Sequence, residues 1–152
     1  MKAFLFNADY VEDRGVKCMV EIIDGELNLE KARSLFSYHK SKKYDLFEVG
    51  VVTPSLIPTG VLKTGQVGYF LSNMKSIQDA HIGDTFYTAG DRDKIEPFPG
   101  YEPPQCMVFA GIYPEDAIQY ENCEKAINSV LLTDGSVTFQ YENSAALGGG
   151  FR

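Results

Sequence analysis

The chain has 152 residues, 44% of them apolar, and a formal net charge of -7. This length accommodates one ordinary domain, or one small domain and part of a second. The apolar fraction is normal for a protein with a packed core. The negative charge argues against a dedicated nucleic-acid-binding protein, because such affinity depends on neutralising phosphates. It does not exclude local basic contacts inside a larger assembly.

Neither a targeting segment nor a membrane span is recognisable in the sequence. No apolar run approaches the roughly 18 residues needed to cross a bilayer. Residues 1–7 carry one positive charge and an apolar stretch too short for a signal peptide, so we expect a strand there. The three widely spaced cysteines, Cys18, Cys106 and Cys123, indicate reduced and mostly buried thiols, which suit an intracellular compartment.

Alternating patterns typical of strands dominate the first 89 residues. Residues 16–22 alternate in this way, and Asp24-Gly25 follows as a hairpin-turn signal. Short strands separated by Gly, Pro and Asp turns are typical of a closed or nearly closed barrel. We therefore predict a mainly β fold with a β-barrel domain over residues 1–90. Its further strands are predicted at 2–9, 33–38, 46–52, 67–72 and 85–89.

The composition changes between Gly90 and Pro104. Proline removes amide donors and fixes φ, so this proline-rich stretch cannot form a central strand. We predict a linker at residues 91–103 and a second domain at residues 104–152. The residues that indicate the linker are Pro97, Pro99, Gly100, Pro103 and Pro104.

The second domain is predicted to be half of a split β-α-β sandwich. The apolar residues 106–112 predict a strand, which Tyr113-Pro114 ends. A helical pattern follows, and after a turn at Asp134-Gly135 residues 137–141 alternate as a strand. A two-layer module of this kind needs a further strand and a second helix to cover its sheet. The helical stripe consists of Tyr120, Cys123, Ile127 and Val130.

Residues 144–152 run from small side chains through three glycines to Phe151-Arg152. Composition alone favours a flexible tail. The alternating strand before them favours the start of another strand whose continuation is missing, so we expect the last residues to be disordered for lack of partners. An exposed strand edge invites pairing with another chain, and we expect a dimer to form through such an edge.

Motifs for nucleotide, metal or covalent chemistry are absent from the sequence. Gly148-Gly149-Gly150 is not followed by Lys-Ser or Lys-Thr, as a phosphate-binding loop requires. His39 and His81 lack a Cys or carboxylate at metal-ligand spacing. Asp91-Arg92-Asp93 lacks the central Gly and closing Glu of a calcium loop. No Ser-His-Asp or Cys-His arrangement is indicated, so we assign no catalytic, cofactor-binding or metal-binding residue.

A single basic cluster occupies residues 39–44. Lys40, Lys42 and Lys43 lie beside His39 and Tyr44. Lysines can contact RNA phosphates while an aromatic ring lies near the bases, so the three lysines are candidate rRNA contacts. The alternative is a soluble hairpin tip, which lysines also favour.

Six short motifs follow one another along the chain: Arg14-Gly15-Val16, Gly65-Gln66-Val67-Gly68-Tyr69, Ile82-Gly83-Asp84-Thr85, Pro97-Phe98-Pro99-Gly100, residues 108–114 and residues 144–152. Each motif is weak alone, but their order and spacing extend over nearly all of the chain. Together they closely resemble the LepA family, also called elongation factor 4. The chain departs from the family at residues 29–32, where Leu-Glu-Lys-Ala stands in place of a Gly-Asp turn.

This resemblance implies a part of a ribosome-associated translational GTPase. Residues up to about Ala89 would form its second domain, a β-barrel, and residues from about Pro104 would open its third domain, an α/β sandwich. A GTPase domain would precede Met1, so GTP and magnesium would bind the full-length protein and not this part. The implied partners are the ribosome, with its rRNA and proteins, tRNA, and the chain's own GTPase domain.

The expected function is that of a non-catalytic fragment. It would position the GTPase domain on the ribosome and act in elongation, which in this family is linked to back-translocation of tRNA. The implied location is the mitochondrial matrix or plastid in a eukaryote, or the cytoplasm in a bacterium. The alternative is a free-standing β-barrel that binds a protein or ligand and is unrelated to translation.

Overall fold

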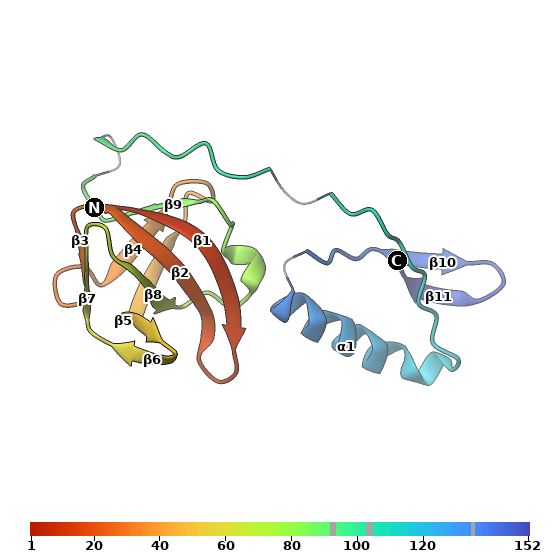
Figure 1. Ribbon diagram of the computed structural model, residues 1–152. Coiled ribbons are helices and arrows are strands. Elements are labelled where there is room, and N and C mark those ends of the chain that lie inside the picture. Colours follow the sequence, from red (N-terminus) through yellow and green to blue (C-terminus); the bar gives the residue numbers. More distant parts are fainter. Residues whose placement is uncertain (92–93, 103–104, 135) are drawn as a thin grey trace. The chain divides into compact units, whose positions relative to one another are not determined.

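A computed structural model describes residues 1–91, 94–102, 105–134 and 136–152 (Figure 1). Arg92-Asp93 and Pro103-Pro104 of the predicted linker, and Gly135 of the predicted turn, lie outside the described residues. The chain divides into two compact units, Met1–Glu102 and Pro103–Arg152. In the part of the chain that the structure describes, no helix is long and apolar enough to cross a membrane.

The first unit is a closed barrel of six antiparallel strands among the described residues. The strands follow the order β4-β9-β1-β2-β8-β5, and a further pairing of β5 with β4 closes the ring. The barrel that the sequence predicts is thus confirmed. The strands are β1 (Lys2–Val11), β2 (Gly15–Asp24), β4 (Ser34–Ser37), β5 (Lys43–Thr53), β8 (Val67–Ser72) and β9 (Thr85–Tyr87).

Short elements that the sequence pattern did not predict surround the ring. Strand β6 (Ser55–Pro58) pairs with β5 as a hairpin extension (Figure 1). Strands β3 (Glu26–Asn28) and β7 (Val61–Lys63) form a separate two-stranded sheet. A single turn of 3-10 helix, η1 (Ile77–Asp79), precedes β9.

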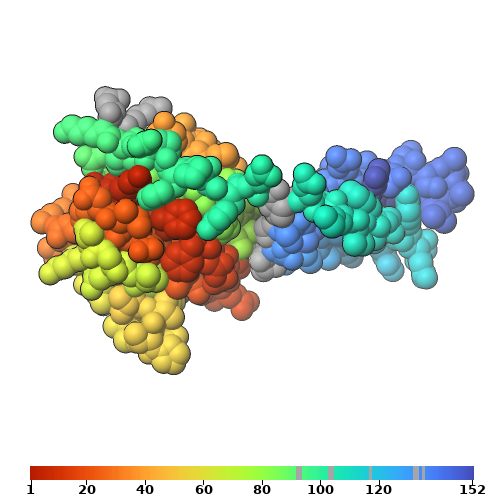
Figure 2. Space-filling model, turned by 45° about the horizontal axis from the view of Figure 1, so that its top comes forward, coloured from red at the N-terminus to blue at the C-terminus, as the bar shows by residue number. Residues whose placement is uncertain are grey.

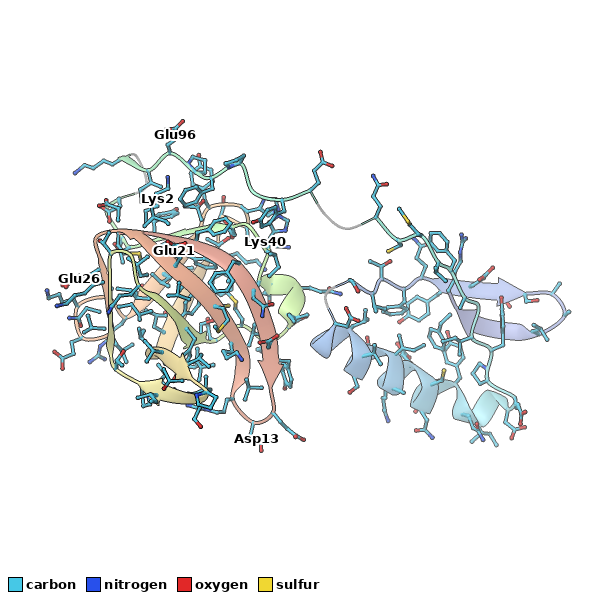
Figure 3. All side chains as sticks on the ribbon, in the orientation of Figure 1. Lys2, Asp13, Glu21, Glu26, Lys40 and Glu96 are labelled. Atoms are coloured by element: carbon cyan, nitrogen blue, oxygen red, sulfur yellow. The ribbon has the colours of Figure 1, made fainter. Side chains whose placement is uncertain are left out.

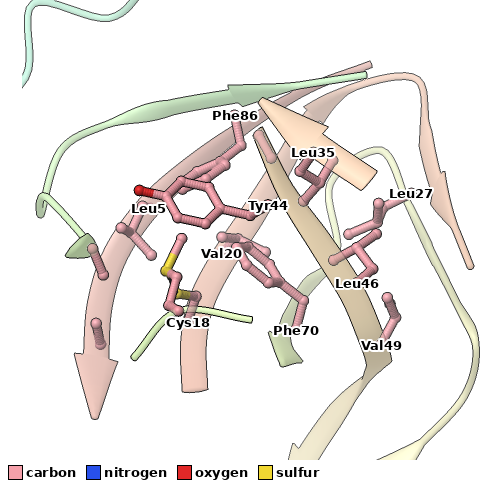
Figure 4. Packing of buried hydrophobic residues seen from close by; sticks show 14 of the residues in the cluster. Leu5, Cys18, Val20, Leu27, Leu35, Tyr44, Leu46, Val49, Phe70 and Phe86 are labelled. Carbon is pink, nitrogen blue, oxygen red and sulfur yellow. Dashed lines mark hydrogen bonds between the residues drawn. The ribbon is translucent and has the colours of Figure 1, made fainter. Parts of the chain in front are cut away.

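The barrel interior is filled by the alternating apolar positions of its strands (Figure 4). In β2, every second residue from Val16 to Ile22 is buried, as the period-2 pattern predicts. Phe70 and Phe86 meet edge to face, with ring centroids 5.3 Å apart. The largest fully buried side chains include Tyr69, Phe70, Phe86, Leu5, Ile22, Leu27, Leu35 and Leu62.

All three cysteines are free thiols, but their environments differ. Cys18 is fully buried, and its Sγ lies 3.6 Å from Sδ of Met74. Burial, and secondarily the charge of Asp84, raise the pKa of the Cys18 thiol far above its ordinary value. Cys106 is exposed and Cys123 is half-buried. The prediction of mostly buried thiols is therefore confirmed for Cys18 and wrong for Cys106.

Two glycines permit the close approach of β5, β6 and β8. A Cβ atom on Gly68 would lie 2.4 Å from the carbonyl oxygen of Gly50 and 2.6 Å from Cδ2 of Leu62. A Cβ on Gly50 would lie 2.2 Å from the carbonyl oxygen of Ile57. Gly68, which precedes Tyr69 in the second sequence motif, is thus required for packing. Any side chain at this position would force β5 and β8 apart.

The turn at residues 29–32 is organised by Asn28. Its Oδ1 accepts a hydrogen bond from the Glu30 amide at 2.9 Å, and its backbone carbonyl accepts from Lys31 and Ala32. Lys31 also pairs with Glu26, with Nζ 2.5 Å from Oε1. An Asn-nucleated turn therefore lies where the resemblance in sequence leads us to expect a Gly-Asp turn.

Much of the predicted linker packs on the barrel. We name residues 94–101 the strap, which crosses the β1 side of the first unit (Figure 2). The Phe98 ring lies 5.3 Å from that of Phe4, and the Phe98 amide donates to Oγ1 of Thr85 at 2.9 Å. Nζ of Lys2 lies 3.9 Å from the Phe98 ring centroid. The strap is thus bound by aromatic, cation–π and hydrogen-bonding contacts.

The second unit contains a helix and a hairpin. The short η3 (Ala117–Gln119) leads into α1 (Tyr120–Thr133), which confirms the predicted helix. Strands β10 (Tyr141–Ser144) and β11 (Gly148–Phe151) pair antiparallel. Tyr120, Cys123 and Ile127 are half-buried along the predicted stripe, whereas Val130 is exposed.

Two strand predictions in this unit are wrong. Residues 106–112 form no strand, apart from a bridge in which Ile112 and Phe151 exchange hydrogen bonds at 2.7 and 2.9 Å. Residues 137–141 contribute only Tyr141 to a strand. A strand needs a neighbour for its backbone groups, and residues 106–111 pair with none among the described residues. Met107 and Val108 are also 87% and 88% exposed.

The expected disorder of the last residues is also wrong. Phe151 is 1% exposed, and its ring stacks on Tyr120 at a centroid distance of 4.8 Å. Gln140 and Arg152 exchange two backbone hydrogen bonds of 2.8 Å each. The glycine-rich end is therefore part of a strand, as the pattern predicted, and that strand is anchored by its final aromatic side chain.

We predict that Gly68→Ala destabilises the barrel by about 1–3 kcal/mol, because the added methyl group overpacks the β5–β8 contact. Hydrogen exchange of the β2 and β8 amides measures this loss separately from the second unit. Gly65→Ala is the control: its Cβ meets nothing within 4 Å, and only its positive φ of 80° opposes the change. Equal losses in the two variants would contradict the packing role of Gly68.

Candidate nucleic-acid interface

The basic cluster lies in the hairpin that joins β4 to β5. The pairing of Leu35 with Tyr44 and Phe36 with Lys43 brings the two strands together. We name residues 38–43 the basic loop. The Ser37 amide donates to the Lys42 carbonyl at 2.9 Å, and the Tyr38 amide donates to the Thr85 carbonyl at 3.0 Å. The loop backbone is thus held to both its own hairpin and β9.

The buried side chain of Asp84 holds the basic loop in place through hydrogen bonds. Its carboxylate is 3% exposed and accepts hydrogen bonds from the His39 amide at 3.0 Å and the Thr85 amide at 2.7 Å. Its second oxygen accepts from the Ser37 hydroxyl, which in turn accepts from the Lys40 amide at 3.0 Å. A buried carboxylate requires such partners. The sequence motif containing Asp84 carries this role, which sequence reasoning did not identify.

Ser37, His39 and Asp84 lie together but do not form a catalytic triad. The Ser37 hydroxyl donates directly to the carboxylate, and His39 reaches Asp84 through its backbone amide. A triad requires the imidazole to accept the serine proton. Within the described ranges, no group of three His, Cys, Asp or Glu side chains could hold a metal ion. The arrangement is suited to hold a loop in place.

The three candidate lysines share the basic loop but differ in their neighbours. Nζ of Lys42 lies 3.6 Å from Oδ1 of Asp79, and Nζ of Lys43 lies 3.6 Å from Oδ1 of Asp45. Lys40 is exposed and forms no ion pair with another described residue (Figure 3). Exposed pairs contribute little energy and exchange readily. The ammonium group of Lys40 is therefore available to bind a phosphate. Lys42 and Lys43 could exchange their carboxylate partners for a phosphate.

The aromatic residue near these lysines is not the predicted one. Tyr44 is only 5% exposed and its hydroxyl donates to the Asp79 carbonyl at 3.4 Å, so it cannot stack on a base. Burial, followed by the charge of Asp79, raises the pKa of Tyr44 to about 12. Tyr38 is 41% exposed instead. Strand alternation could have found it, because Ser37 points inward and the next residue must point out.

The two histidines, far apart in sequence, are in contact. Their rings stack with centroids 3.9 Å apart and planes 10° from parallel. Burial and the neighbouring His39 lower the pKa of His81, whereas the carboxylate of Asp84 opposes this shift. His39 thus ties the basic loop to the segment before β9 by a contact that local sequence cannot indicate.

We predict that Asp84→Ala loosens the basic loop, because three hydrogen-bond donors lose their acceptor. A cost of about 1–3 kcal/mol is expected for each donor left buried and unpaired. Hydrogen exchange of the 38–42 amides measures the effect. Asp45→Ala, which removes an exposed carboxylate from the same hairpin, should leave these amides protected. Unchanged protection in Asp84→Ala would contradict the anchoring role.

Comparison with known proteins identifies relatives that match the chain from end to end. No family model matches the chain. It is 43% identical over 152 residues to the mitochondrial translation factor GUF1 of Laccaria bicolor, covering 100% of this chain and 24% of that protein. It is 40% identical over 151 residues to a mitochondrial GUF1 homologue of Dictyostelium discoideum, covering 99% of this chain and 22% of that protein.

A solved structure shares the fold. A crystal structure of a protein from Thermus thermophilus has a TM-score of 0.58 with 16% identity, covering 99% of this chain and 21% of that one. This likeness supports the fold alone. The chain spans 24% and 22% of the length of the two GUF1 proteins, and 21% of the chain in the solved structure. Over its whole length, the chain is therefore homologous to one segment of the GUF1 translation factors, which are homologues of LepA.

Proposed function

We propose that the chain is a non-catalytic segment of a translation factor that acts on the ribosome in mitochondria. The observation that carries the proposal is its identity of 40–43% to proteins named mitochondrial translation factor GUF1, maintained over its full length. The closed barrel with its docked strap supports a rigid, binding role. GTP and magnesium would bind another domain of a longer protein, as in the family that the motifs resemble.

Within such a protein, the barrel would position the GTPase domain on the ribosome during elongation. A relay between nucleotide state and tRNA movement, including back-translocation, needs a body that moves as a unit. The barrel supports this proposal, since its strands close into a ring around a buried core. tRNA and ribosomal proteins are further proposed partners. Pairing of the second unit with another chain through the edge of β10 stays a prediction.

The basic loop is the proposed contact with rRNA. Its backbone is fixed by Asp84, while Lys40 and Tyr38 of the same loop are both exposed. Phosphate contacts need only such local charge, and an exposed aromatic ring can stack on an unpaired base. A loop with an ordered backbone also binds with a smaller loss of conformational entropy.

We predict that Lys40→Glu weakens binding to mitochondrial ribosomes. The loss of one phosphate contact should reduce the slope of log affinity against log salt by about 1. Cosedimentation at several salt concentrations measures this slope. Lys63→Glu, an equal charge change on β7, is the control and should leave binding close to that of the wild type. Equal losses in both variants would indicate a general charge effect and contradict a contact at the basic loop.

We predict that this chain by itself binds neither GTP nor its magnesium complex, because the sequence has no phosphate-binding loop. Isothermal titration calorimetry with GTP and magnesium should show no binding heat. A micromolar affinity would contradict the assignment of nucleotide binding to another domain, and would leave the ribosome prediction standing.

A further inference from the structure

The second unit contains an apolar slot between two segments that are not strands. We name residues 106–110 and residues 136–139, which line this slot, its two walls. The slot has a volume of about 520 Å³, and Ile127 and Val130 of α1 form its floor. Arg152, the residue directly after β11, also lines it. The slot thus begins where β11 ends.

Backbone pairs on both sides of β11 fix the register of the slot. Phe151 exchanges two hydrogen bonds with Ile112 on one side. Arg152 exchanges two with Gln140 on the other side. Such pairs recur at every second residue along two antiparallel strands. The same register, continued beyond Arg152, therefore runs between the two walls.

The backbone groups of both walls lack the partners that this register would supply. The first residue beyond Arg152 would lie opposite Ala110, and the second would lie opposite Thr138. Neither wall forms a backbone–backbone hydrogen bond with any described residue. Both walls contain residues that favour strands, such as Val108 and Val137. The walls therefore have the composition of strands and lack a strand between them.

The two faces of the slot differ in polarity. Helix α1 covers one face of the hairpin, and Phe151 stacks on its Tyr120 at a centroid distance of 4.8 Å (Figure 1). The Phe139 ring lies 6.2 Å from that of Phe151. Arg152 is exposed, with its guanidinium 5.1 Å from the ring centroid of Phe109. Because side chains alternate along a strand, the first and third residues beyond Arg152 would face the apolar floor, and the second would face solvent.

We propose that the slot binds the polypeptide segment that follows Arg152 in a longer protein, as a strand that continues β11 between the two walls. This inference rests on the proposed function in one respect, that the chain is part of a longer translation factor. The chain covers 24% and 22% of two GUF1 proteins, so most of such a protein lies outside the matched segment. The register requires apolar side chains at the first and third positions of the added strand.

Binding separates the walls at one point. Sγ of Cys106 lies 3.5 Å from Oγ1 of Thr138 across the slot. Strands on either side of an inserted strand lie about 9.6 Å apart, which is twice the usual spacing. Insertion therefore breaks this contact and covers the thiol of Cys106, which is exposed in this structure.

Two extended chains of equal composition test the proposal. The in-phase chain carries Val-Thr-Val-Thr after Arg152, with valine at the first and third positions, and the out-of-phase chain carries Thr-Val-Thr-Val. In the in-phase chain, the amides of Ala110 and Thr138 should exchange about tenfold more slowly than in the 152-residue chain, as one backbone hydrogen bond each would cause. The out-of-phase chain should show little change. Equal protection in both chains, or none in the in-phase chain, would overturn the proposal.

Alkylation of Cys106 gives a second readout on the same chains. The in-phase extension should slow the reaction of Cys106 and leave that of buried Cys18 unchanged, because Cys18 belongs to the barrel. Adding Thr138→Pro to the in-phase chain removes one amide donor from the slot and should restore fast alkylation. In the 152-residue chain that amide donates to no described backbone group, so Thr138→Pro alone is the folding control. Alkylation that stays slow in the extended Thr138→Pro chain would overturn the proposal.

Size-exclusion chromatography of the 152-residue chain separates this occupant from a second copy. A monomer with unprotected Ala110 and Thr138 amides is expected. Protection of these amides that rises with concentration, together with a dimer, would assign the slot to a second copy and overturn the proposal. None of these measurements involves the basic loop, so the ribosome-binding test of Lys40 succeeds or fails independently.

Discussion

Closure of the ring by the pairing of β4 with β5 is the constraint on which the first unit depends. Strand β4 has only four residues, yet it pairs with β9 on one side and β5 on the other. Without this pairing, the sheet would end in two open edges and its apolar face would meet water. The hydrogen bond from Leu46 to the carbonyl of Arg33 extends the closure by one more backbone contact.

The same closure places the candidate site. The hairpin that joins β4 to β5 must emerge beside β9, because β4 lies between them. Asp84, directly before β9, therefore lies beneath that hairpin and its carboxylate can meet the amide of His39. A net negative protein thus presents a small positive loop whose backbone is held by an acidic residue. The anion is buried beneath the loop, and the cationic side chain of Lys40 remains at the surface.

The sequence predicts those features that depend on local pattern. The alternation in β2 and the spacing in α1 have strong periods, and both elements form where they are predicted. Residues 106–111 are equally apolar but pair with no strand among the described residues, so composition could not decide their structure. The His39–His81 stack and the role of Asp84 join residues more than 40 positions apart. Only the closed topology of the barrel brings these residues together. The sequence therefore contains His39, His81 and Asp84 but does not indicate what they contact.

The contrast between Cys18 and Cys106 gives the chain a reporter for each of its two units. Cys18 lies in the barrel core with its thiol held protonated by burial, whereas Cys106 lies exposed in the second unit. A thiolate-directed alkylating reagent can reach Cys106 in the native protein, but reaches Cys18 only when the barrel opens. The rate at which Cys18 is modified therefore measures how often the barrel opens, without an introduced probe.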